Sequence, residues 1–329
     1  MPTMNDVARL AGVSRGTVSN YINGVQVKLE SQQRIQAAIT ELNYVPNSTA
    51  RELKLNRSNF VVFILPTTRT PFFAELTQEI QQMLKQKNYK MLLCTSQNDI
   101  AEELEYIQMA KEQKVAGILT ISYSDLGKYL TNDVPIVSIE NHLSKTIPCV
   151  SSDNYAGGCM AAKQLLEKGA KNLLILTRST EKTAVNYGQR AQGFIDYCQH
   201  KQVDYTVFDS PYHEDRFYPQ LQTFLMNTYQ KACPFDGIFA VSDQYADFSY
   251  TILRQLGHAV PQSVQLIGFD GGKMYPEQKY FLSSIRQPVK KIAEQCVSRL
   301  EELLWNKEND VKKTTILPIE FVQGETTKK

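Results

Sequence analysis

The sequence predicts an all-α head of three short helices, followed by an α/β core of two lobes that each hold a parallel sheet. Residues 3–43 space their apolar side chains as helices do and contain no strand-like run. From Phe60 onward, short β-rich apolar runs alternate with helical segments. Continuous apolar strands that alternate with helices are typical of parallel sheets covered on both faces.

The head is predicted to form a helix-turn-helix unit. Thr3 and Asp6 have the spacing of a capping box at the start of a first helix, which Gly12 ends. Ser14 is placed to cap a second helix, and the apolar period predicts a third over about 31–42. Three helices with a tight glycine-containing turn between the first two make up such a unit.

The segment 44–58 separates the two regions. Pro46 cannot continue a helix, so a separate element is expected to start there, with Asn47 as the cap of a short helix that runs to about Leu55. A helix this short is not stable alone in water. We therefore expect it to fold only against a partner.

The core is predicted to form two similar α/β lobes, because 59–329 is too long for one comfortable sheet. Ligands bind beyond the carboxyl ends of parallel strands, so two facing lobes predict a cleft. The expected strands are 60–65, 91–94, 116–121, 135–139, 172–177, 237–241 and 264–269, and the expected helices are 72–86, 102–112, 154–168, 187–200, 245–256 and 289–305.

Composition indicates a globular protein with a substantial core, since 42% of the residues are hydrophobic. The sequence has neither a signal-peptide pattern nor an apolar run near the roughly 18 residues of a membrane helix. We expect a cytoplasmic protein with no membrane partner. The net charge is +2, and residues 1–58 carry seven Lys/Arg against four Asp/Glu. A modestly basic head is compatible with nucleic-acid binding but does not require it.

The cysteines are predicted to be reduced core thiols rather than metal ligands or disulfides. They lie singly in apolar stretches without a CxxC pair, and the chain has only four histidines. No metal and no cofactor are expected. The six are Cys94, Cys149, Cys159, Cys198, Cys233 and Cys296.

One short motif in the head is typical of an enzyme. GVSRG (12–16) matches the GxSxG nucleophile elbow of hydrolases. The elbow needs a strand before its serine, whereas here a helix precedes it, and the chain shows no persuasive histidine partner. We therefore expect no enzyme activity and no catalytic residues.

A set of ordered segments resembles the lactose-repressor (LacI/GalR) family over the whole chain. The body is also similar to repressors of sucrose and related oligosaccharide operons, notably around SSDNYAGG. The segments are NDVARLAGVSRGTVSNYING (5–24), LNYVPNSTARELK (42–54), PFFAEL (71–76), SSDNYAGG (151–158), RAQGF (190–194), IGFDGG (267–272) and IRQP (285–288).

The resemblance implies a DNA-binding head, a hinge helix and a core like periplasmic sugar-binding proteins, assembled as a homodimer. The short tail 323–329 lacks the apolar heptads of a tetramerising helix, which favours the dimer. The expected domains are 1–45 for the head, 46–58 for the hinge and 59–329 for the core, with lobe 1 at about 59–158 and 286–316 and lobe 2 at about 159–285 and 317–329.

The resemblance also implies which head residues contact operator DNA. Arg15 and Gly16 begin the second helix, which enters the major groove, and Arg15 is suited to guanine. Asn20 stands where the family usually has Arg, so the operator differs from the usual one or Asn20 contacts adenine. Ser14 and Thr17 are equally suited to capping and to phosphate. The full set in the head is Thr3, Ser14, Arg15, Gly16, Thr17, Ser19, Asn20 and Asn23.

The hinge is implied to enter the minor groove. Leu53 holds the position of the apolar wedge that opens a base step, and it is equally suited to packing against its dimer mate. A ligand that alters the spacing of the lobes would control whether this helix forms. The expected hinge contacts are Asn47, Ala50 and Leu53.

The implied effector-binding residues stand at strand ends. Aromatic rings suit the apolar face of a sugar, and acids, an amide and a guanidinium suit vicinal hydroxyls. At least one of the two phenylalanines is expected in the core, and Ser242 replaces an Asn common in sugar-responsive members. The set is Thr67, Thr68, Phe72, Phe73, Glu140, Arg190, Ser242, Asp270 and Gln287.

These features predict a repressor of a carbohydrate-utilisation operon that is controlled allosterically by a sugar or sugar phosphate. Two alternatives remain open at this point. A catabolite-control regulator would use a phosphocarrier protein as its co-repressor. A solute-binding protein without DNA function would share the core, but it would lack the head and would carry a secretion signal, a pattern that this sequence does not show.

Overall fold

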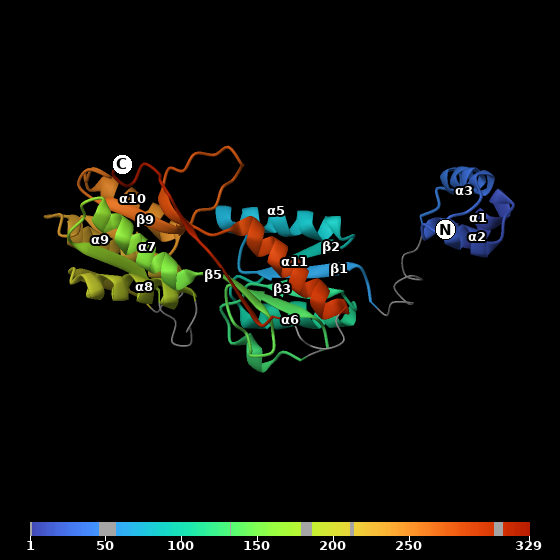
Figure 1. Ribbon diagram of the computed structural model, residues 1–329, viewed down its shortest axis with the longest axis horizontal. Helices are drawn as coiled ribbons and strands as arrows, with labels where there is room; N and C mark the ends of the chain where they lie inside the picture. The colour runs from blue at the N-terminus through green and yellow to red at the C-terminus, as the bar shows by residue number, and fades with distance from the viewer. Residues whose placement is uncertain (1, 46–56, 132, 179–185, 211–213, 306–311) are drawn as a thin grey trace. The chain divides into compact units, whose positions relative to one another are not determined.

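A computed structural model describes residues 2–45, 57–131, 133–178, 186–210, 214–305 and 312–329 (Figure 1). The chain divides into two compact units, residues 1–58 and 59–329. We call them the head and the core. The predicted hinge helix falls almost entirely outside the described residues.

The head contains α1 (Met4–Ala11), α2 (Arg15–Ile22) and α3 (Leu29–Glu41). Thr3 and Asp6 form the predicted capping box, and Gly12 ends α1 in the left-handed region at φ 62°. Helix α3 begins at Leu29, ahead of the predicted start. Its apolar positions pack with those of α1 and α2 around one small core, which buries Val7, Ala8, Ala11, Val18, Ile35, Ala38 and Tyr44.

The first lobe is built on a parallel sheet in the order β11-β5-β4-β3-β1-β2. Its strands are β1 (Phe60–Leu65), β2 (Lys90–Thr95), β3 (Gly117–Thr120), β4 (Ile136–Ile139), β5 (Cys149–Ser152) and β11 (Thr314–Leu317). Its helices are α5 (Pro71–Gln86), α6 (Ile100–Glu112), the 3₁₀ turn η1 (Leu126–Lys128) and α11 (Val289–Trp305).

Strand β1 shows why this sheet is covered on both faces. Val61 and Phe63 pack in the cluster that α5 and α11 complete, whereas Val62 and Ile64 pack in the cluster that includes Ile107 of α6. Successive side chains of a strand point to opposite faces, so a continuous apolar run needs helices on both sides. Figure 1 shows α5 and α11 side by side over this sheet.

The second lobe has a sheet in the order β12-β10-β9-β8-β6-β7, parallel except for β12. Its strands are β6 (Leu173–Thr177), β7 (Tyr205–Asp209), β8 (Gly237–Ala240), β9 (Gln265–Asp270), β10 (Ser283–Arg286) and β12 (Glu320–Val322). Its helices are α7 (Asn154–Glu167), α8 (Asn186–Lys201), α9 (Glu214–Tyr229) and α10 (Asp243–Gln255).

The chain passes between the lobes after β5, after β10 and after β11. The first passage comes at Asp153, a few residues before the expected boundary near 158. The whole of α7 belongs to the second lobe, because it packs against α8 in near backbone contact. A Cβ at Gly158 would stand 1.9 Å from the Arg190 carbonyl oxygen, so only glycine permits this approach.

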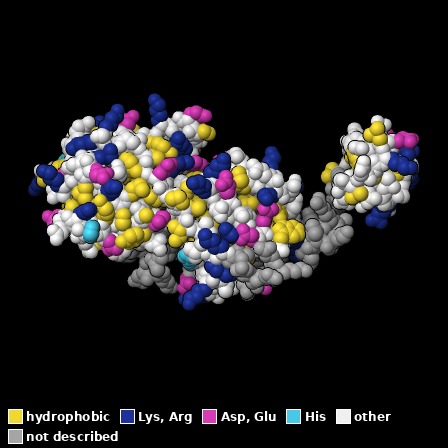
Figure 2. All heavy atoms as spheres, in the orientation of Figure 1, with side chains coloured by type: hydrophobic (Ala, Val, Ile, Leu, Met, Phe, Trp, Pro, Cys, Tyr) yellow, Lys and Arg dark blue, Asp and Glu magenta, His cyan; other side chains and the backbone are white. Residues whose placement is uncertain are grey.

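Figure 2 shows basic and acidic side chains interspersed over the visible face of the core. Within the described helices, none combines the length and apolar character needed to cross a bilayer. All six cysteines are free thiols, but the prediction that they lie in the core is wrong in part: Cys233 is exposed, and Cys94 and Cys159 are half-buried.

Candidate nucleic-acid interface and ligand cleft

The first turn of α2 is set by local hydrogen bonds. Ser14 Oγ accepts from the backbone N–H of Thr17 at 3.1 Å and lies 2.9 Å from Thr17 Oγ1. At the other end of the helix, Asn23 Nδ2 donates to the Ser19 carbonyl oxygen at 2.7 Å and to Ser19 Oγ at 3.3 Å. These four polar side chains of the predicted DNA-contacting set therefore support the helix itself.

Three other predicted residues of α2 project from this supported helix. Arg15, Gly16 and Asn20 are exposed, and no described residue accepts a hydrogen bond from Arg15. A Cβ at Gly16 would meet only Ser14 Oγ, at an ordinary 3.6 Å. Nothing within the head therefore requires glycine at position 16.

The start of α1 holds Thr3, the remaining predicted contact in the head. Thr3 is exposed and its Oγ1 donates to Asp6 Oδ2 at 2.7 Å. This hydrogen bond and that from the Thr3 backbone lower the pKa of the Asp6 carboxyl. Thr3 thus caps α1, as its position predicts. The hinge contacts Asn47, Ala50 and Leu53 lie outside the described residues.

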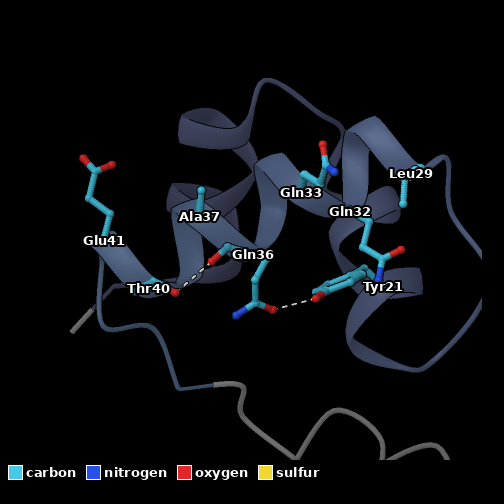
Figure 3. A pocket seen from close by; sticks show the side chains of 8 residues that line it. All are labelled: Tyr21, Leu29, Gln32, Gln33, Gln36, Ala37, Thr40 and Glu41. Carbon is cyan, nitrogen blue, oxygen red and sulfur yellow. Dashed lines mark hydrogen bonds between the residues drawn. The ribbon is translucent and has the colours of Figure 1, made fainter.

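A groove of about 710 Å³ lies between Tyr21 of α2 and one side of α3 (Figure 3). Tyr21 Oη donates to Gln36 Oε1 at 2.6 Å and ties the two helices together. The lining is rich in amides, Glu41 is its charged residue, and it includes no basic side chain. The groove therefore does not suit a phosphate backbone, and no pattern in the sequence predicts it.

In the core, a cleft of about 470 Å³ opens where strands of both sheets end. Each lobe contributes residues that directly follow its strands, as parallel sheets do at their carboxyl edges. The lining residues are Pro66, Thr67, Thr68, Arg69, Phe73, Thr95, Gln97, Asn98, Tyr123, Arg178, Tyr187, Tyr218 and Gln244.

Three predicted effector residues line this cleft: Thr67, Thr68 and Phe73. Phe72 instead packs in the core of the first lobe and is 5% exposed, with its ring 5.4 Å from that of Phe73. Phe73 belongs to the same buried cluster, so the expectation that at least one of the pair is a core residue is confirmed. Both follow Thr70, whose Oγ1 caps α5 by accepting from the Phe73 N–H at 3.2 Å.

A second polar cluster, the Arg190 network, lies beside the cleft and is almost closed to solvent. Arg190 is 1% exposed. Its Nε donates to Asn154 Oδ1 at 2.8 Å, and one of its terminal nitrogens donates to the Val241 carbonyl oxygen at 2.7 Å and to Asp270 at 3.3 Å. Its guanidinium also lies 3.6 Å from the ring centre of Phe269.

The network joins the two lobes. Glu140 directly follows β4 and lies 3.6 Å from Arg190, and it accepts from the Ser152 N–H at 2.7 Å. Gln287 donates to Asp270 at 2.7 Å and accepts from Ser152 Oγ at 2.8 Å. The predicted effector residues Glu140, Arg190, Asp270 and Gln287 are thus brought together, but none is among the residues that line the cleft.

Burial raises the pKa values of two acids in this region, Asp270 and Asp243. Loss of solvent raises the pKa of Asp270 to about 6, although Arg190 and Gln287 act to lower it. Burial, together with the nearby Asp270, also raises the pKa of Asp243. Ser242, the last predicted effector residue, is 3% exposed and caps α10 through a hydrogen bond from the Tyr245 N–H.

A further contact between the lobes lies at the start of α5. Glu75 accepts from Arg286 at 2.6 Å and from the Lys273 N–H at 2.9 Å. A Cβ at Gly272 would stand 2.3 Å from the Phe72 nitrogen. The loop after β9 therefore sits directly on the first turn of α5.

Sequence reasoning missed most of the cleft lining. Tyr123 follows β3 and stacks on Tyr187 of α8 across the lobes, with ring centres 5.7 Å apart. Arg178 directly follows β6, while Gln97 and Asn98 follow β2. Their common signal is a polar or aromatic residue shortly after a strand, and it could have been read from the sequence.

Comparison with known proteins matches both units. Residues 3–47 match the model of the bacterial regulatory proteins, lacI family, and 162–327 match a periplasmic binding protein-like domain. The chain is 32% identical over 327 residues to a sucrose operon repressor of Pediococcus pentosaceus, with 99% of each chain covered.

Solved structures agree on the fold. A periplasmic binding protein/LacI transcriptional regulator from Alkaliphilus metalliredigens, complexed with D-xylulofuranose, is 28% identical, with a TM-score of 0.72 over 83% of this chain and 100% of that one. A lac repressor dimer bound to operator is 19% identical, with a TM-score of 0.81 over 99% of this chain and 98% of that one. The chain belongs to the lacI family of bacterial transcriptional regulators.

Proposed function

We propose that this chain is a homodimeric repressor of a carbohydrate-utilisation operon, and that a sugar or sugar phosphate in the cleft sets its affinity for operator DNA. The exposed surface of α2 is the observation that supports operator binding. A helix held by its own caps presents Arg15, Gly16 and Asn20 to solvent. A guanidinium and an amide are the side chains that form paired hydrogen bonds with guanine and adenine.

Gly16 supports close approach of that surface to DNA. The head leaves room for a methyl group at this position, and an alanine would favour the helix by up to about 1 kcal/mol. A glycine that the fold does not need suits a helix whose backbone comes close to a partner. The major groove is the partner that the family implies.

The cleft supports control by a sugar. Tyr123, Tyr187, Tyr218 and Phe73 offer aromatic faces, while three threonines offer hydroxyl groups. Aromatic faces pack against the apolar side of a sugar ring, and hydroxyls and amides bind its hydroxyl groups. The relative from Pediococcus pentosaceus is a sucrose operon repressor, so sucrose and fructosides are the first ligands to test.

Exposed apolar side chains support a dimer. Leu93 is 42% exposed on β2, an edge strand of the first sheet, and Met274 and Tyr275 are 64% and 59% exposed in the second lobe. Large apolar side chains on an exposed strand edge and loop are suited to protein–protein contact.

The test combines operator selection with a ligand screen on the full chain. We expect selected DNA to contain a two-fold symmetric site, and we expect a sugar that raises the melting temperature to change DNA affinity as well. Failure to enrich any DNA sequence would contradict the regulator assignment. Operator binding that no sugar or sugar phosphate alters would instead favour a phosphocarrier protein as the co-repressor.

A further inference from the structure

We infer that the cleft selects a phosphorylated sugar over the corresponding neutral sugar. This inference rests on the proposed function and concerns the same cleft. Among the described residues that line it, the charged side chains are Arg69 and Arg178, and none is an acid. A cleft that holds cations without carboxylates favours an anionic ligand through its local potential.

Arg178 is the stronger of the two cations. It is 8% exposed, and its guanidinium lies 6.0 Å from the ring centre of Tyr187, another lining residue. A charge so far removed from water interacts more strongly with a nearby ion than a surface charge does. Arginine also binds phosphate oxygens through two parallel hydrogen bonds. Arg69 is exposed at the mouth of the cleft and adds a second positive charge.

The backbone adds to this potential. Helices α5, α8 and α10 each place a residue of their first turn in the lining, namely Phe73, Tyr187 and Gln244. The amino-terminal end of a helix carries a partial positive charge, which favours phosphate groups. Three such ends around one cleft act in the same direction as the arginines.

The remainder of the lining suits the sugar part of the ligand. Asn98 Oδ1 is buried, and no described residue donates a hydrogen bond to it. Asn98 and Gln97 both have positive φ, at 64° and 50°, which is a strained conformation for residues other than glycine. An unsatisfied acceptor held by a strained loop suits a donor from the ligand, such as a sugar hydroxyl.

The acids of the Arg190 network are not among the residues that line the cleft. Glu140 and Asp270 both lie within ion-pair distance of Arg190. Burial raises the pKa of Asp270 to about 6, which favours its neutral form relative to an exposed carboxyl. Arg190 therefore offsets part of the negative charge of the acids nearest the cleft.

The experiment measures calorimetric binding of matched pairs to the full chain: glucose and glucose 6-phosphate, fructose and fructose 6-phosphate, and inorganic phosphate alone. We expect the phosphorylated member of at least one pair to bind tenfold or more tightly than its neutral partner. We also expect added salt to reduce that advantage. Equal or tighter binding of the neutral members, or no binding of any probe, would overturn the inference.

Two variants assign the effect to the cleft. Arg178→Gln should reduce the phosphate advantage about tenfold, and Arg69→Gln should reduce it less. The control is Arg254→Gln, which removes an exposed arginine from the last turn of α10. Arg69 and Arg254 are exposed, so both variants should fold even if Arg178→Gln does not. Equal advantages in Arg69→Gln, Arg178→Gln and Arg254→Gln would overturn the inference. Operator binding by the same proteins shows separately whether the proposed regulator function stands.

Discussion

Arg15 of the head and Arg190 of the core are both predicted to bind a partner, yet they differ in exposure and in hydrogen bonding. Arg15 is exposed on α2. Arg190 is 1% exposed and already bonds to Asn154, the Val241 carbonyl oxygen and Asp270. Position in a family motif therefore does not reveal whether the hydrogen-bond donors of an arginine remain available.

The largest expected difference between these arginines is in stability. Arg190→Met leaves Glu140 and Asp270 buried without their cation, which typically costs about 3–5 kcal/mol. Arg15→Met is the control and should change stability by less than about 0.5 kcal/mol. Urea unfolding of the full chain, followed by circular dichroism, checks both. Equal midpoints for the two variants would show that the Arg190 network does not hold the lobes.

The same network should also give the core a pH dependence. The pKa of Asp270 is raised to about 6 in the folded protein, so the native state keeps a proton that the unfolded chain releases from about pH 4. Stability from this group is present at low pH and is lost as pH rises from about 4 to 6. Asp270→Asn should flatten that fall, by about 3 kcal/mol from the size of the shift. Unfolding measured across this range tests it, and an unchanged slope assigns the dependence to other groups.

For Arg15 the expected effect is on recognition. Arg15→Ala should lose about 1–3 kcal/mol of discrimination at one symmetric operator position, because a paired contact with guanine disappears. Binding to a set of single-base operator variants measures this. A uniform loss over all sequences would instead assign Arg15 to the phosphate backbone.

For Gly16 the expected effect on folding is small and stabilising. Gly16→Ala has room in the head and should stabilise α2 by up to about 1 kcal/mol, while operator binding weakens. Thermal unfolding and DNA titration of one preparation separate the two quantities. Undiminished operator binding would show that α2 does not approach DNA closely at this position.

The elements that the sequence predicted are those with strong local signals. Strand β1 and helix α11 match their expected bounds, because a continuous apolar run and a long helical period leave little choice. Helix α9 was missed because Pro219 lies inside it, and a proline in a helical pattern normally ends the helix. Strand β7 was missed because it is a short, partly exposed edge strand.

The candidate sites differ in the same way: some depend on local spacing, and others depend on contacts between distant segments. The caps Thr3 and Ser14 depend on neighbours three residues away, so spacing alone predicts them. The cleft joins segments from Pro66 to Gln244, and the Arg190 network joins Glu140 to Gln287. Which strand-end residues become buried and which remain open depends on how two sheets meet, and no local pattern contains that information.

The position of Gly272 between the two lobes leads to a genetic prediction. Any side chain there would act as a wedge between the loop after β9 and the first turn of α5, which are joined through Glu75. A single-nucleotide change from a glycine to an alanine codon is enough to insert one methyl group between these two segments. Selection for cells in which the proposed sugar control is lost should therefore recover position 272, far along the gene from the codons that specify the head.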